Sequence, residues 1–160
     1  MKTKFFLILF CCMCLFSSCL KSGLDEIENS NLCAISSVAL EHRWLAQNAN
    51  GYDVLCRQQL TLSNNAPDEN KQITFVVTVP SASNSDTYSA FNESIRNSVS
   101  LERLYLTAII SSAATITPLN DAPQMGTPAS FEIGKEYQYE VTAANGEKAV
   151  YTIVIQDFEK

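Results

Sequence analysis

Side chains that could carry out chemistry are few in this chain of 160 residues. Its one histidine, His42, shares an alternating apolar pattern with Leu40 and Trp44, which favours an inward or edge position over a catalytic base. A structural zinc site needs about four ligands, and His42 with Cys33 and Cys56 does not supply them. The sequence contains no nucleophile elbow, P-loop, dinucleotide fingerprint or EF-hand loop. We therefore predict no catalytic residue, no metal site and no cofactor.

Paired carboxylates could hydrolyse a glycosidic bond if two of them faced one another across a cleft. The candidates are scattered along the chain, as solvated surface acids are: Glu41, Asp53, Glu93 and Glu102. A hydrolase with acidic catalytic residues is kept as an alternative. It requires two carboxylates that face one pocket.

Four aromatic residues lie near expected strand ends or loops: Tyr52, Tyr88, Phe91 and Tyr105. Exposed aromatic rings stack on sugars and anchor protein interfaces. These four are therefore the candidate ligand contacts. The alternative is that their rings complete the core.

The beginning of the chain is organised around Cys19. Lys2 and Lys4 introduce a continuous apolar run over residues 5–16, and two serines lead into the cysteine. This layout resembles the lipobox of bacterial lipoproteins, in which a diacylglyceryl group is attached to the cysteine and the chain is cut just before it. The resemblance implies a cleaved lipoprotein signal peptide over residues 1–18 and attachment to a membrane through a lipid on Cys19.

Residues 19–32 are expected to form a flexible acidic tether. Leu20, not aspartate, follows the cysteine, so the usual signal for retention at the inner membrane is missing and the outer membrane is the expected location. Asp25, Glu26 and Glu28 resemble a surface-export signal of Bacteroidota. Surface and periplasmic orientation both stay open, with the surface slightly favoured.

Removal of the signal peptide leaves 142 residues, enough for one domain with a substantial core. Loss of Lys2 and Lys4 takes the formal net charge from −6 to −8. A net-acidic surface argues against nucleic acid as a partner. Of the six cysteines, only Cys33 and Cys56 then remain besides the lipid site. An exported protein can join them in a disulfide, and the alternative is two reduced thiols that fill small spaces in the core.

Alternation of apolar and polar residues, interrupted by turn residues, predicts strands over residues 33–45, 52–62, 73–79, 101–111 and 113–117. Residues 81–100 are expected to hold a short helix or an ordered excursion between sheets. A C-terminal hairpin is predicted around Asn145-Gly146, the pair that favours a type I′ turn. About seven short strands with little helix predict an all-β antiparallel sandwich over residues 33–160.

Several stretches together carry a resemblance to a known family: residues 19–25 (CLKSGLD), 41–44 (EHRW), 110–118 (ISSAATITP), 139–146 (YEVTAANG) and 151–153 (YTI). They are similar to the Bacteroidales lipoproteins of domain of unknown function 5018. They are more loosely similar to bacterial Ig-like and cadherin-like sandwich modules. The resemblance implies an Ig-like or cadherin-like sandwich on an outer-membrane lipoprotein, and it supplies no catalytic residues.

The lipid anchor, the sandwich pattern and the sparse chemistry predict a non-catalytic lipoprotein of the cell envelope. We expect a surface module that binds a glycan or another protein, as an accessory to nutrient uptake or adhesion. The alternative from another class is a structural subunit or anchor of an envelope or appendage complex.

Overall fold

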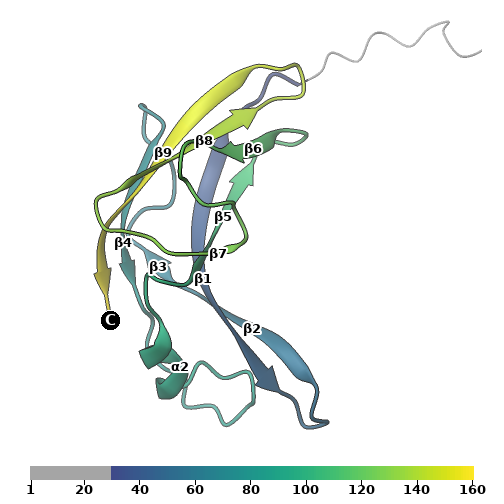
Figure 1. Ribbon diagram of the computed structural model, residues 1–160, viewed down its shortest axis with the longest axis vertical. Coiled ribbons are helices and arrows are strands. Elements are labelled where there is room, and N and C mark those ends of the chain that lie inside the picture. Colours follow the sequence, from purple (N-terminus) through teal and green to yellow (C-terminus); the bar gives the residue numbers. More distant parts are fainter. Residues whose placement is uncertain (1–29) are drawn as a thin grey trace, which may run out of the picture.

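The computed structural model describes residues 30–160 (Figure 1). The expected signal peptide 1–18, the lipid site Cys19 and most of the tether 19–32 lie outside the described residues. Residues 30–34 have no regular structure and lead directly into the first strand.

Strands make up most of the described chain. In chain order they are β1 (Ile35–Gln47), β2 (Asp53–Gln59), β3 (Thr61–Leu62), β4 (Gln72–Thr78), β5 (Leu104–Ile110), β6 (Thr115–Pro118), β7 (Pro128–Ala129), β8 (Glu136–Thr142) and β9 (Lys148–Glu159). A short helix, α2 (Glu93–Ser98), lies between β4 and β5. Apart from the two-residue strands β3 and β7, seven strands span residues 30–160, as the turn spacing predicts.

The strands form two sheets, with the order β2-β1-β5-β7 in one and β3-β4-β9-β8-β6 in the other. Alternate residues of each strand point into the space between the sheets, where Phe75, Leu104 and Tyr139 are fully buried. These two layers confirm the all-β sandwich. One neighbouring pair, β4 with β9, is parallel. The long crossover that a parallel pair requires is provided by residues 79–147.

The expected strand 52–62 is in fact two strands in different sheets. β2 pairs with β1, whereas β3 pairs with β4. Leu60 lies between them, is 2% exposed, and its N–H donates to the Leu40 carbonyl at 2.9 Å. The chain crosses between the layers at this residue. Apolar alternation cannot reveal such a step, because Leu60 and Leu62 continue the spacing of β2.

The β8–β9 hairpin is present, but its turn is not the predicted type I′. Ala143 N–H donates to the Glu147 carbonyl at 2.8 Å, and Gly146 N–H donates to the Ala143 carbonyl at 3.0 Å. Gly146 has φ +94°, while Asn145 is not among the residues with positive φ. These features define a three-residue loop with a type I turn and a glycine bulge. The prediction of a two-residue loop was wrong because an Asn-Gly pair also suits this longer turn.

β1 is the longest strand, and it takes part in two pairings in succession. Ile35 to Glu41 pair with β5, and Glu41 to Gln47 pair with β2. Beyond Glu41, β1 and β2 continue as a two-stranded ribbon past the beginning of β5 (lower right in Figure 1). Helix α2 and the loop before it lie at the same end of the molecule. This end carries the candidate site.

Candidate binding groove

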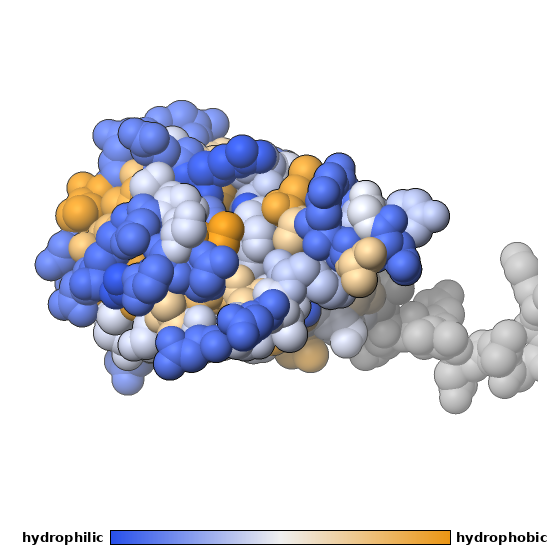
Figure 2. All heavy atoms as spheres, turned by 90° about the horizontal axis from the view of Figure 1, so that it is seen from below, coloured by the Kyte–Doolittle hydropathy of each residue, from blue (hydrophilic) through white to orange (hydrophobic). Residues whose placement is uncertain are grey.

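A groove of about 400 Å³ lies between the β1–β2 ribbon and the segment that connects α2 to β5. We call it the ribbon groove, and its lining residues are His42, Arg43, Trp44, Leu45, Leu55, Ser98, Arg103 and Tyr105. The lining contains two guanidinium groups and several rings but no carboxylate. Viewed from this end, the surface shows apolar side chains in separate patches among hydrophilic ones (Figure 2). The groove therefore combines aromatic surface with positive charge.

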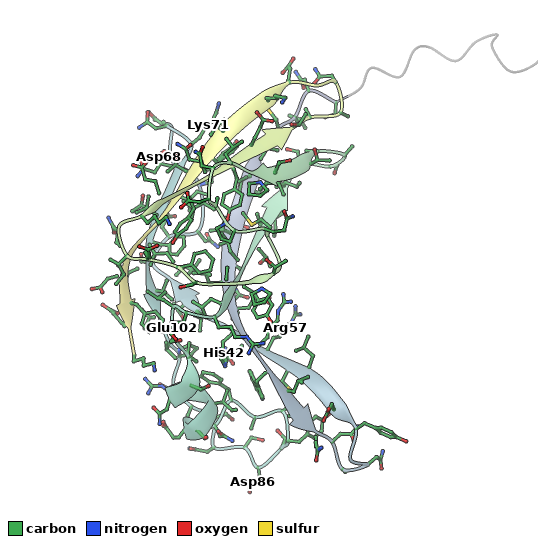
Figure 3. The ribbon with its side chains drawn as sticks, viewed as in Figure 1. His42, Arg57, Asp68, Lys71, Asp86 and Glu102 are labelled. Carbon is green, nitrogen blue, oxygen red and sulfur yellow. The ribbon has the colours of Figure 1, made fainter. Side chains whose placement is uncertain are left out.

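The alternation of β1 brings both faces of the ribbon to the groove. Arg43 and Leu45 point to the outer face, where they lie opposite Arg57 and Leu55 of β2. His42 and Trp44 point to the inner face. Figure 3 shows His42 and Arg57 where the ribbon leaves the body of the sandwich. The groove runs along the strand edge between these faces, so it is lined by side chains of both.

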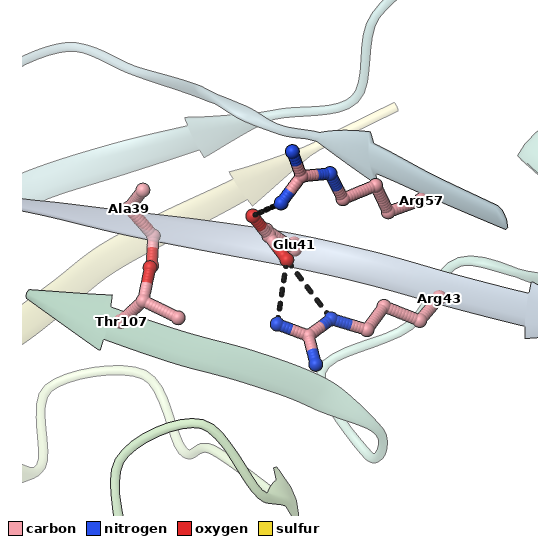
Figure 4. Close-up of polar contacts among 5 residues, drawn as sticks. All are labelled: Ala39, Glu41, Arg43, Arg57 and Thr107. Atoms are coloured by element: carbon pink, nitrogen blue, oxygen red, sulfur yellow. Dashed lines mark hydrogen bonds and ion pairs between the residues drawn. The ribbon is translucent and has the colours of Figure 1, made fainter. Parts of the chain in front are cut away.

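Glu41 holds the arginine side chains at the point where β1 leaves β5 (Figure 4). One carboxylate oxygen of Glu41 accepts from Arg43 Nε at 2.9 Å and Nη2 at 2.8 Å, and Arg57 Nη1 lies 3.5 Å from the other oxygen. The Arg43 guanidinium also covers the Tyr105 ring, with Cζ 4.3 Å from the centroid. Arg43 is thus fixed before any ligand arrives, and one carboxylate shared by two guanidinium groups leaves a positive surplus.

His42 is buried at the inner wall of the groove, with 8% of its surface exposed. Its Nε2 lies 3.5 Å from Ser98 Oγ, and its Nδ1 has no hydrogen-bond partner within residues 30–160. Burial lowers the pKa of His42, and the charges of Arg103 and Lys160 lower it further. The ring stacks on Trp44 with centroids 6.0 Å apart. The expected inward position is confirmed, and the imidazole is neutral at pH 7.

The inner wall is supported by α2 and the residue just before its cap. Asn92 caps the helix, because its side-chain oxygen accepts from Ile95 N–H at 3.0 Å. Phe91 is 5% exposed and packs against Trp44 with centroids 6.0 Å apart at 47°. A core residue therefore sets the position of the indole.

The structure separates the four aromatic residues predicted as ligand contacts. Tyr105 lines the ribbon groove. Tyr52 and Tyr88 are exposed, at 69% and 51%, but neither is part of the lining. Phe91 belongs to the core, so its ring is not open to a ligand. For this residue the structure shows the alternative, in which the ring completes the core.

Sequence reasoning missed Arg43, Trp44 and Arg103 as site residues. A weak signal was available in Glu41-His42-Arg43-Trp44, where a carboxylate and a guanidinium share one side of a strand next to two aromatic side chains. Arg103 gives no such signal, because it comes from the turn before β5 and only the fold brings it to the groove.

Cys33 and Cys56 are free thiols. Cys33 precedes β1, whereas Cys56 lies opposite Trp44 near the other end of that strand. The stretch of β1 from Ile35 to Trp44 alone is roughly 30 Å long. A disulfide needs Cα atoms within about 7 Å. The structure therefore shows the alternative of two unbonded thiols, one half-buried and one buried.

The carboxylates predicted for a hydrolase do not converge. Glu41 is engaged by two arginines, and Asp53, Glu93 and Glu102 are exposed and outside the groove lining. Within residues 30–160, no group of three or more His, Cys, Asp or Glu side chains is placed to hold a metal ion. None of the helices in that same range is long and apolar enough to cross a bilayer.

The fold and the groove define a two-sheet β-sandwich module with an arginine-lined groove at one end. The model of the family described as DUF5018-related matches residues 35–154, and the chain belongs to this family. No curated protein matches the chain. One solved structure is similar, that of a protein from Bacteroides fragilis NCTC 9343 provisionally described as secreted. It is 31% identical, with a TM-score of 0.68, and the match covers 81% of this chain and 98% of that chain. Nothing in these similarities points to catalysis.

Proposed function

We propose that the protein is a non-catalytic binding module of the cell envelope, anchored by a lipid on Cys19, and that the ribbon groove binds a ligand with carboxylate groups. The observation that supports this proposal most strongly is the positive charge of the groove lining. Arg43 and Arg103 line the groove in a chain whose formal net charge is −6, and the Glu41 carboxylate that binds Arg43 is shared with Arg57 and does not line it. Guanidinium groups bind carboxylates through charge-assisted hydrogen bonds in matching planar geometry.

The position of the groove supports this proposal. The described chain begins beside the β8–β9 turn, where Asn145 N–H donates to the Ser30 carbonyl at 3.2 Å. The β1–β2 ribbon, whose side chains line the groove, lies toward the other end of the longest axis (Figure 1). A lipid on Cys19 would therefore be joined to the domain at the end that lies away from the groove. The likeness to a protein provisionally described as secreted supports a location outside the cytoplasm.

We place the protein at the outer membrane with its groove at the cell surface, in an Ig-like or cadherin-like sandwich. Labelling of growing cells with an alkyne fatty acid should tag the protein and fail for Cys19→Ala. Protease added to intact cells should degrade the labelled protein. Protection from the protease would contradict surface display, but it would not bear on whether the groove binds carboxylates.

Binding can be read directly at the groove, because Trp44 is the chain's one tryptophan. The chain from residue 19, with Cys19→Ser, is titrated with polyglutamate, with polygalacturonate and with neutral dextran. We expect at least one carboxylate polymer to change Trp44 emission, less so as salt is raised, and dextran to leave it unchanged. If neither acidic polymer changes the emission, the proposal fails.

A charge-matched pair of variants tests the place of binding. Arg103→Gln should weaken the interaction about three- to five-fold, the range of an exposed ion pair. Lys148→Gln removes the same charge from a surface pair with Glu140 at the β8–β9 hairpin and should leave affinity unchanged. Equal weakening by both variants would show that the response follows net charge and not the groove.

A further inference from the structure

β1 has an unpaired edge beside the ribbon groove. On one side, β2 pairs with β1 as far as Gln47. On the other side, the ladder between β5 and β1 ends at Tyr105 and Glu41. Within the part of the chain that the structure describes, no strand continues the sheet along Arg43 to Gln47 on that side. A place for one further strand is left open where β5 stops.

Hydrogen bonds at both ends of the ribbon show how β1 is oriented. Leu60 N–H donates to the Leu40 carbonyl at 2.9 Å, and Asn48 N–H donates to the Tyr52 carbonyl at 3.0 Å. In an antiparallel ladder, bonded and non-bonded positions alternate along each strand. The even-numbered residues of β1 between these two bonds therefore direct their main-chain groups toward β2.

The main-chain groups of the odd-numbered residues of β1 face the open edge. Arg43, Leu45 and Gln47 direct their N–H and C=O groups toward the position that β5 would occupy if it continued. This stretch of β1 is about 13 Å long. Leu45 and Gln47 are exposed, and Arg43 is only half-buried. Three donors and three acceptors at strand spacing match the backbone of another polypeptide, which a sugar chain does not.

We propose that the ribbon groove takes an extended acidic segment of a partner protein, which adds as a strand to the free edge of β1 and places a carboxylate at Arg103. This rests on the proposed function, which requires only that the groove bind carboxylates. Successive side chains of the added strand point to opposite faces of the sheet, so the partner segment alternates acidic side chains, on the outer face with Arg43, and apolar side chains on the inner face. Its apolar face covers Trp44.

The protein's own acidic tether does not reach this edge within one molecule. Asp25, the most distant of its acids, is five residues from Ser30, a span of at most about 17 Å. The stretch of β1 from Ile35 to Arg43 alone is about 26 Å long, and Ser30 lies beyond its near end. The occupant is therefore a segment of another chain.

Edge pairing is tested with a ten-residue peptide of alternating glutamate and valine and two of its N-methylated forms. One form carries the methyl groups on every valine nitrogen and the other on every glutamate nitrogen. Only one set of amides faces β1 in a paired strand. We expect one methylated form to bind at least ten-fold more weakly than the parent and the other to bind within about two-fold, as measured by Trp44 emission.

Two measurements on the protein complement the peptides. Exchange of the Leu45 and Gln47 amide hydrogens should slow when the parent peptide is bound. Leu45→Pro removes one edge donor and no bond to β2, so it should weaken binding about five-fold. If this variant does not fold, the exchange measurement on the unaltered chain decides the question.

The outcomes separate the two proposals. If polygalacturonate changes Trp44 emission and the peptide does not, or if both methylated peptides bind as the parent does, edge pairing is refuted and carboxylate binding stands. If no acidic polymer or peptide changes the emission, both proposals fail.

Discussion

Replacement of Phe91 by alanine separates a structural from a ligand-binding role for this ring. Phe91 is 5% exposed and packs against Trp44 with ring centroids 6.0 Å apart. Truncation of a buried phenylalanine costs about 3–5 kcal/mol. Phe91 precedes a two-turn helix at one end of the sandwich, where neighbours can relax, so we expect the lower value, about 3 kcal/mol. For a domain of this size the melting temperature should fall by about 10 °C.

The assay is urea unfolding of Phe91→Ala, followed by Trp44 emission and by circular dichroism. The native emission should shift to longer wavelength, because the indole loses its cover. Tyr88→Ala is the matched control. Tyr88 is 51% exposed, and its truncation should change the free energy of unfolding by no more than about 0.5 kcal/mol. A cost below about 1 kcal/mol for Phe91→Ala, or equal costs for the two variants, would refute the assignment of Phe91 to the core.

Three further predictions concern stability, each measured as the free energy of unfolding in urea. Tyr139→Phe should cost about 1–2 kcal/mol, because the buried hydroxyl donates to the Pro123 carbonyl at 2.8 Å; no loss would contradict that bond. Gly146→Ala should cost about 1 kcal/mol from its φ of +94° alone, since a Cβ there meets nothing within 4 Å; a neutral change would contradict the turn described. The lowered pKa of His42 means that the imidazole takes up a proton more readily in the unfolded chain than in the folded chain. Stability should therefore fall as pH drops below about 6.5, and His42→Gln should flatten this dependence between pH 7.5 and 5.5. An unchanged slope would contradict a buried neutral ring.

Apolar alternation predicted much of the fold, because each sheet has one buried face. In β4, the alternation of Ile73, Phe75 and Val77 with polar or smaller residues identified the strand, and all three are fully buried. The crossing at Leu60 was missed because the side chains before and after it both point into the core. The spacing of apolar residues therefore continues unchanged where the chain passes from one sheet to the other. The turn at Asn145-Gly146 was assigned the wrong loop length, since two turn types accept the same pair of residues.

The candidate site was harder to predict than the core. It is assembled from the end of β1, the middle of β2 and the turn before β5. The spacing of residues within any one of these segments does not predict that they meet. Arg103 and Trp44 are 59 positions apart in the sequence. The open edge of β1 also depends on where β5 stops relative to β1, which is a matter of register and not of residue type.

The central claim is that carboxylate ligands bind in the ribbon groove. It is tested most directly by nuclear magnetic resonance of the ¹⁵N-labelled chain from residue 19, with Cys19→Ser, during titration with polyglutamate. We expect the largest shifts at the amides of Arg43, Trp44 and Arg103 and at the indole N–H of Trp44. Shifts confined to the β8–β9 hairpin or to the loops of Tyr52 and Tyr88, or no shifts at all, would contradict it.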